Sequence, residues 1–164
     1  MSKSPSQRGA LIVKAEVINP FLESARRVIE QLIQVSPSPG NLGVKNVELV
    51  DDHIWIMIGM TGQLSGNIVF GLNEQVALRM VSAMMGGFVL TEIDEMGKSA
   101  ISELGNMISG NASTILSSQG IVVDITPPQV MKSENLTTFV PQRALYIPLT
   151  VEGIGELDIQ VMIS

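Results

Sequence analysis

The sequence predicts an α+β domain with a mostly antiparallel sheet and helices packed on it. Three observations support this prediction. The 164 residues are enough for one domain with a substantial core, but too few for two comfortable ones. Apolar residues make up 45% of the chain and charged residues 16%, which is a globular composition. Segments with helical periodicity alternate with strand-like runs, and short links join several of these runs, as in antiparallel hairpins.

The beginning of the chain, residues 1–9, is expected to be a disordered N-terminal tail, and residues 10–164 to form a single domain. The first residues include basic side chains, but only a four-residue apolar run precedes Lys14. That pattern is not a secretory signal. No apolar run approaches the roughly 18 residues that a membrane span requires. We therefore expect a cytoplasmic protein that does not bind a membrane.

Charge and cysteine content exclude several classes of function. The net charge is −6, and no cluster of Lys and Arg offers contacts to phosphates, so we expect no nucleic-acid partner. Without cysteine there is neither a disulfide framework nor a thiolate metal site. The single histidine, His53, has no His, Cys or Asp ligand set at metal spacing. We interpret it as a solvated side chain at the end of a strand and expect no metal site.

The first expected helix begins at Asn19-Pro20. Asn can cap a helix, and Pro is tolerated in the first turn, where its missing N–H costs nothing. A turn-forming string at residues 36–41 ends this helix near Val35. One stripe of the helix is apolar, and the other side carries charges. The apolar stripe consists of Phe21, Ala25, Val28, Ile29 and Leu32.

Strands and a second helix follow. Three strand-like runs, joined by short links, predict an antiparallel meander. The second helix is expected between Asn73, which can cap its start, and Gly86-Gly87, which end it. The three runs are residues 44–50, 53–61 and 64–72.

A long helix comes next, beginning at Thr91 or Asp94 and ending at Gly120. After it, we expect a strand that stops at a pair of prolines, an irregular segment, and a final hairpin of two strands. These segments are residues 121–126, 129–142, 143–151 and 155–163, in that order.

The order of helix, strands, helix, helix and strands suggests an internal duplication. A shift of 80 residues aligns polar positions of the first helix with those of the long helix. Such sparse matches also arise by chance, so the pattern alone leaves both interpretations open. The aligned pairs are Asn19 with Ser99, Glu23 with Glu103, and Arg26 with Asn106.

The long helix carries the candidate chemistry. Ser99, Glu103, Asn106 and Gly110 fall on one line along it, opposite an apolar face. A solvated helix face is one interpretation, but such a face is usually filled with good helix formers, whereas Gly and Asn cost about 0.5–1 kcal/mol each. Small residues around one carboxylate and one carboxamide favour a docking surface. Gly105 falls on the flank between the faces, where close packing is one explanation.

The same residues resemble the signature of the CheC/CheX/FliY phosphatases of chemotaxis. That signature is Asp or Ser, three residues, Glu, two residues, Asn, about twenty-two residues and Pro. Twenty-one residues separate Asn106 from Pro128, and Pro127 is one residue nearer, so either proline could be the counterpart. The order of elements also agrees over nearly the whole chain. Two stretches add to the likeness: KSAISELGNMISGNA and NPFLESA.

This resemblance implies a pseudo-symmetric, CheC-like fold made of two similar halves. Members of the family can carry the Glu/Asn pair on both equivalent helices. Here the first helix has Glu23 but Arg26 in place of the asparagine. A single working site of this kind is most like CheX, whose members pair as homodimers. We therefore expect one site and a homodimer.

The resemblance also implies a reaction, the hydrolysis of the aspartyl phosphate on a CheY-like response regulator. The regulator supplies the phospho-Asp, a Mg²⁺ and a Lys, so the chain needs no cofactor of its own. Asn106 would orient the attacking water, and Glu103 would pair with the regulator's Lys. Ser99, Gly110 and Pro128 would contact the partner. The alternative is a non-catalytic adaptor, a regulator-binding or flagellar-switch module on the same fold. The sequence does not name the cognate regulator.

Overall fold

The computed structural model describes residues 5–46, 52–132 and 143–163 of the chain. These described residues form the helices α1 (Pro5–Ile33), α2 (Glu74–Met84) and α3 (Glu95–Ser118). The strands in chain order are β1 (Ser38–Pro39), β2 (Gly43–Asn46), β3 (His53–Gly62), β4 (Gly66–Asn73), β5 (Val123–Ile125), β6 (Gln129–Lys132), β7 (Arg143–Val151) and β8 (Gly155–Ile163).

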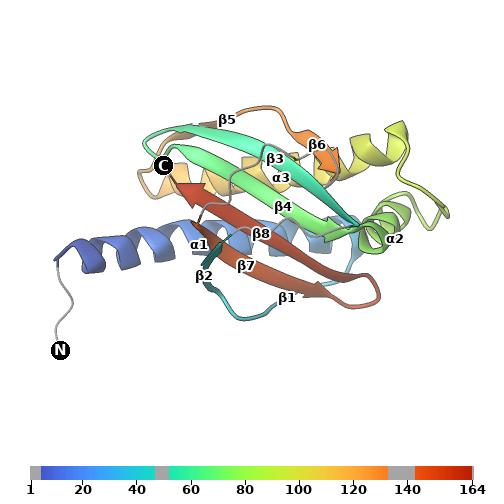
Figure 1. Ribbon diagram of the computed structural model, residues 1–164, viewed down its shortest axis with the longest axis horizontal. Coiled ribbons are helices and arrows are strands. Elements are labelled where there is room, and N and C mark those ends of the chain that lie inside the picture. Colours follow the sequence, from blue (N-terminus) through green and yellow to red (C-terminus); the bar gives the residue numbers. More distant parts are fainter. Residues whose placement is uncertain (1–4, 47–51, 133–142, 164) are drawn as a thin grey trace.

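All of these strands belong to one antiparallel sheet with the order β1-β7-β8-β4-β3-β5 (Figure 1). β2 also pairs with β7, and β6 also pairs with β3. The order is symmetric about the central pair β4 and β8. The first half of the chain contributes the hairpin β3–β4 and the second half the hairpin β7–β8. The short strands β1 and β2 of the first half pair with β7, and the short strands β5 and β6 of the second half pair with β3. The topology therefore supports the internal duplication, and the expected α+β architecture is confirmed.

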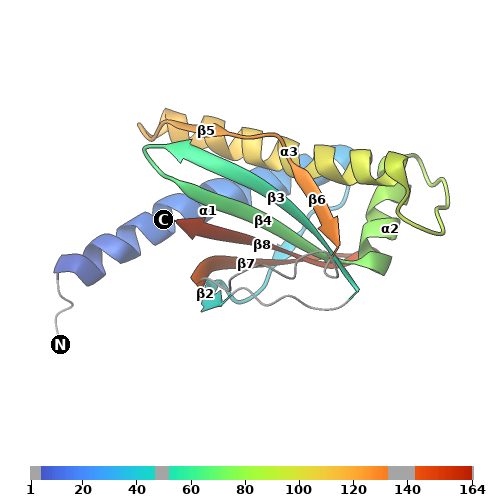
Figure 2. The same cartoon turned by 45° about the horizontal axis from the view of Figure 1, so that its top comes forward.

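The two long helices, α1 and α3, cover the same face of the sheet, as both views show (Figures 1 and 2). β3 illustrates how the sheet contributes, because Ile54, Ile56 and Ile58 alternate toward the helices and are fully buried. Each such side chain stabilises the fold by about 1.5–3 kcal/mol relative to an exposed one. The core residues from the long helices include Phe21, Val28, Ile29, Ile101, Ile108 and Leu116.

The opposite face of the sheet carries a smaller cluster of Trp55, Val69, Ala144 and Met162. His53 stacks on Trp55, with ring centroids 5.4 Å apart, and is half-buried. His53 does begin β3, as expected, but its ring is only partly solvated because it packs on Trp55.

Asp158 also lies on this outer face, in β8. Burial raises the pKa of its carboxyl group, and three neighbours oppose that shift: a hydrogen bond from Gln160 (3.0 Å) and the nearby charges of Lys45 and His53. The Gln160 side chain is itself buried, and its Oε1 accepts no hydrogen bond from any residue that the structure describes.

Helix starts depend on their caps. Asn73 caps α2 as predicted, because its Oδ1 accepts a hydrogen bond from the Gln75 N–H at 2.8 Å. Asp94, rather than Thr91, caps α3, since its Oδ1 accepts from the Gly97 N–H at 2.8 Å.

The predicted start of the first helix is wrong. α1 begins at Pro5, and Pro20 lies inside it. Residues 5–9, which we expected in a disordered tail, are helical, whereas residues 1–4 lie outside the described part of the chain. Buried Val17 and Ile18 extend the apolar stripe backwards from Phe21, so packing offsets the backbone hydrogen bond that a proline removes.

Two strand assignments also differ from the prediction. The β3–β4 hairpin is confirmed. β2, however, pairs with β7 and not with β3, so it is not the first strand of the predicted meander. The segment expected to be irregular forms β6 over its first residues, because the edge of β3 offers backbone groups that need partners. Residues 47–50 of the first expected strand and 133–142 of that segment lie outside the described residues. The β7–β8 hairpin is confirmed.

Candidate functional site

Helix α3 carries four of the five predicted site residues on one line. Its helical geometry places Ser99, Glu103, Asn106 and Gly110 on the face opposite to the core. Ser99 and Glu103 are exposed, and Asn106 and Gly110 are half-buried. The apolar face is buried as expected, through Ile101, Leu104, Ile108 and Ala112.

The two glycines of this stretch serve different ends. A Cβ added at Gly110 would meet nothing within 4 Å, so this glycine leaves open space beside Asn106. A Cβ at Gly105 would lie 3.1 Å from Ile56 Cγ2 and 3.4 Å from the Phe70 ring. Gly105 therefore lets α3 pack closely on the sheet, in agreement with the close packing considered for it. Gly110 has no side chain to hinder a partner that approaches this part of the helix.

Hydrogen bonds to neighbouring elements hold α3 in place. The buried Ser24 hydroxyl of α1 donates to the Ile108 carbonyl oxygen at 2.5 Å, two residues after Asn106. Nearer the end of the helix, the Ser113 hydroxyl donates to the Val123 carbonyl of β5 at 3.3 Å. The polar line therefore sits on a helix fixed from both sides, which suits a site that must orient a bound group.

Pro128 lies off this helix, in the connection between β5 and β6. Together with Pro127 it lines a hollow of about 430 Å³ at the edge of the sheet. Thr126 fastens this connection to β3, because its N–H donates to the Gly59 carbonyl at 2.9 Å and its hydroxyl accepts from the Gly59 N–H at 2.7 Å. Both prolines share the hollow, so the choice between them stays open.

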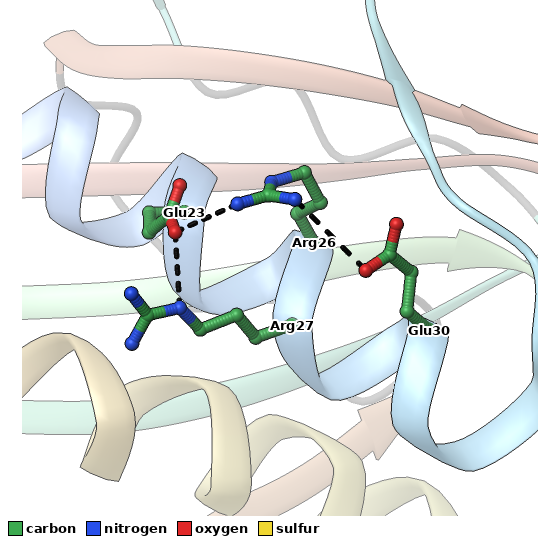
Figure 3. Close-up of polar contacts among 4 residues, drawn as sticks. All are labelled: Glu23, Arg26, Arg27 and Glu30. Carbon is green, nitrogen blue, oxygen red and sulfur yellow. Dashed lines mark hydrogen bonds and ion pairs between the residues drawn. The ribbon is translucent and has the colours of Figure 1, made fainter.

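On the equivalent face of α1, charged side chains pair with one another (Figure 3). The Glu23 carboxylate accepts hydrogen bonds from Arg26 at 2.7 Å and from Arg27 Nε at 2.9 Å, and Arg26 also lies 3.9 Å from Glu30. The hydrogen bond from Arg26 is the main reason that the pKa of Glu23 lies below its ordinary value. The helical pattern puts Arg26 and Arg27 on the same charged side as Glu23, and spacings of three and four residues are those at which such ion pairs form.

Within the described residues, no group of three His, Cys, Asp or Glu side chains is placed to hold a metal ion. No helix in the same part of the chain is both long and apolar enough to cross a membrane.

Fold and site together define a CheC-like α+β domain with one motif-bearing helix. Comparison with known proteins agrees, since residues 54–150 match the family described as chemotaxis phosphatase CheX. The CheY-P phosphatase CheX of Thermotoga maritima is 31% identical over 151 residues, which cover 92% of this chain and 97% of that protein. The chain therefore belongs to the chemotaxis phosphatase CheX family.

Solved structures share the fold over most of their length. CheX from Vibrio vulnificus superposes with a TM-score of 0.78 at 24% identity, covering 91% of this chain and 99% of that one. The CheX–CheY–BeF3–Mg²⁺ complex from Borrelia burgdorferi contains a chain with a TM-score of 0.70 at 25% identity, covering 90% of this chain and 97% of that one. The family and fold implied by the resemblance are thereby confirmed.

Proposed function

We propose that this protein hydrolyses the aspartyl phosphate of a CheY-like response regulator, by presenting Glu103 and Asn106 to the regulator's active site. The observation that carries the proposal is the polar line of α3 on the side away from the core, where an exposed carboxylate and a half-buried carboxamide lie one turn apart. Among the ion pairs of the described residues, none involves Glu103, so its charge is available to a partner. Homology to a CheY-P phosphatase and to a CheX chain in complex with CheY supports this choice of substrate.

Asn106 is assigned the positioning of the attacking water. In-line attack on a phosphoryl group depends on placement and charge stabilisation more than on covalent chemistry. A carboxamide hydrogen-bonds a water molecule without adding negative charge beside the phosphoryl oxygens. It does not take up a proton at neutral pH, so Asn106 orients the nucleophile rather than acting as a base.

Glu103 is assigned to binding. Its carboxylate would be repelled by the phosphoryl group unless it meets a cation. The regulator's active-site Lys offers that cation, and the ion pair would fix the register of α3 across the partner. Ser99 and Gly110 are small, so the partner's backbone can approach α3 closely at both ends of the polar line. Pro128 is proposed as a further partner contact.

The remaining assignments follow from the same substrate. We assign Mg²⁺ to the regulator, so this chain would bring no cofactor of its own; a relative's complex that contains CheX, CheY, BeF3 and Mg²⁺ together supports this assignment. We also propose a homodimer and a cytoplasmic site of action, where a response regulator works.

The test follows the decay of a phosphorylated CheY-type regulator with wild-type protein, Asn106→Ala and Glu103→Ala. Asn106→Ala is expected to lower the turnover rate by about a hundredfold because the water is no longer placed. Glu103→Ala should weaken binding and slow turnover together. Asn106→Asp, which puts a charge beside the phosphoryl group, should lose most turnover but keep most of the binding.

The same experiment separates the proposal from a non-catalytic adaptor. An adaptor would bind the regulator but leave its spontaneous decay unchanged in all of these proteins. Equal decay with wild type and both alanine variants, together with measurable binding, would replace the phosphatase by an adaptor.

A further inference from the structure

Ser109, in the middle of α3, carries a hydroxyl group that is fully buried. Within the part of the chain that the structure describes, its Oγ is one of two buried side-chain polar atoms that make no hydrogen bond. Other polar side chains of α3 bond back to carbonyls of the helix, as Asn111 and Thr114 do at 3.0 and 3.1 Å. A buried hydroxyl without a partner destabilises a fold, so its presence calls for an explanation.

This serine is a neighbour of Asn106 on the helix. Residues three positions apart lie on successive turns, with their Cβ atoms about 5–6 Å apart. Helix side chains lean toward the N-terminus, which directs the Ser109 side chain toward the turn that carries Asn106. A hydroxyl oxygen and a carboxamide nitrogen can meet across that spacing. No hydrogen bond among the described residues involves the Asn106 side chain, so its amide is free to take such a partner.

The equivalent helix lacks this hydroxyl. The shift of 80 residues that aligns α1 with α3 places Ile29 over Ser109, and both residues are fully buried. The position therefore takes an apolar side chain in the half that has Arg26, and a hydroxyl in the half that has Asn106. An apolar side chain is what a core position ordinarily takes, so packing alone does not explain the serine. Its neighbour Asn106 does.

We propose that Ser109 is a positioning residue, whose Oγ accepts a hydrogen bond from Asn106 Nδ2 when the phosphorylated regulator covers α3. This inference rests on the proposed function. A carboxamide has two orientations, with either its oxygen or its nitrogen toward the attacking water. With Nδ2 on Ser109, Oδ1 faces the water and accepts one of its hydrogens, which leaves a lone pair of the water directed at phosphorus. In the reverse orientation, Nδ2 would donate to that lone pair and oppose the attack.

The test compares Ser109→Ala with wild type, both in dephosphorylation of the regulator and in urea unfolding. Alanine removes the hydroxyl and keeps the rest of the side chain. The urea midpoint should equal or exceed that of wild type, because a buried polar group without a partner is removed. kcat should fall about tenfold, the effect of one hydrogen bond on the orientation of the amide, whereas KM should stay within about a factor of two.

Ser102→Ala is the matched control. Ser102 lies one turn before Asn106, on its other side, and is only half-buried, so water can reach its hydroxyl. This variant should keep kcat and KM within about a factor of two of wild type. A double variant, Asn106→Ala with Ser109→Ala, should speed regulator decay as much as Asn106→Ala alone, because Ser109 acts only through the amide. Both of these proteins are compared in excess over the phosphorylated regulator.

Three results would overturn the inference while leaving the proposed function intact. One is a kcat that is unchanged in Ser109→Ala or falls equally in Ser102→Ala. Another is a lower kcat together with a lower urea midpoint, which would make the Ser109 hydroxyl a part of the fold. The third is a further loss when Ser109→Ala is added to Asn106→Ala. Failure of the proposed function looks different, because wild type itself would then leave regulator decay unchanged, and the inference would fall with it.

Discussion

Helices α1 and α3 occupy equivalent places in the two halves of the fold but present different chemistry. Both lie on the same face of the sheet, and Glu23 and Glu103 are 80 residues apart in the chain. Glu23 is held by two arginines at 2.7 and 2.9 Å, whereas no ion pair among the described residues involves Glu103. The residue three positions after the glutamate differs, Arg26 in α1 and Asn106 in α3, and Arg27 adds a second ion pair in α1. The fold supplies the platform, and the side chains around the glutamate decide whether its carboxylate is offered to a partner.

A second difference concerns the space around that carboxylate. Gly110 leaves open space at the end of the α3 line, while the equivalent position in α1 is Glu30, which lies near Arg26. The surface of α1 is thus filled by long charged side chains that pair with one another. A partner approaching α1 would have to displace them before reaching the backbone of the helix.

The largest expected effect comes from making α3 resemble α1 with Asn106→Arg. An arginine there stands three residues after Glu103, as Arg26 stands after Glu23, so it should pair with that carboxylate and remove the water-orienting group. We expect regulator dephosphorylation to fall by at least about a hundredfold, measured as decay of the phosphorylated regulator. Turnover within a factor of ten of wild type would show that the amide is not required.

The reciprocal change tests whether one residue is the whole difference. Arg26→Asn, made in the Asn106→Ala background, should restore no dephosphorylation, because Arg27 still holds Glu23 and Glu30 still occupies the end of the line. Recovered dephosphorylation would contradict this expectation, since an asparagine at position 26 would then be the only change that α1 needs to act on the regulator.

A smaller effect, on stability, is expected from the glycines that distinguish α3. Gly105→Ala should lower the free energy of unfolding by about 1–2 kcal/mol, because its Cβ would press on Ile56 and Phe70, which are buried and have little room to shift. Gly110→Ala should raise it by about 0.5–1 kcal/mol, since alanine is the better helix former and meets nothing there.

Urea unfolding of the two variants measures both values. The equivalent of Gly105 in α1 is Ala25, fully buried, so the first helix already accommodates the methyl group that α3 does not. A stabilising Gly105→Ala would mean that the sheet beneath α3 yields, and that the two helices pack alike.

The candidate site was more predictable from the sequence than parts of the fold. The polar line and the core face of α3 follow from residue spacing along one helix. The cap of α2 follows from the residue type at its start, Asn73. Strand partners depend on distant residues, which explains why β2 was assigned to the wrong neighbour and β6 was missed. The early start of α1 was hidden by Pro20, which is typical of a helix beginning but lies in the interior here. Local periodicity identifies faces, whereas tertiary packing decides lengths and pairings.

The smallest expected effect is that of Glu23→Gln, the counterpart of a change at Glu103. The pKa of Glu23 lies below its ordinary value of 4.5, chiefly because of the hydrogen bond from Arg26. A lowered pKa contributes stability above the unfolded-state value, and that contribution is lost as pH falls through the folded-state value. The pair is exposed, so water and salt screen it. We therefore expect the melting temperature at pH 7 to fall barely, and the difference from wild type to vanish as the pH falls below the lowered folded-state pKa of Glu23.

Activity provides the sharper readout of this last variant. Arg26 and Arg27 already form ion pairs with the Glu23 carboxylate, so it would not be available to the regulator. Glu23→Gln should therefore leave kcat and KM unchanged. Glu103→Gln, measured beside it in the same assay, should raise KM, because the proposed ion pair with the regulator's Lys would be lost. A KM that rises equally in both variants would mean that α1 also contacts the regulator, and that its ion pairs with Arg26 and Arg27 do not keep Glu23 from the partner.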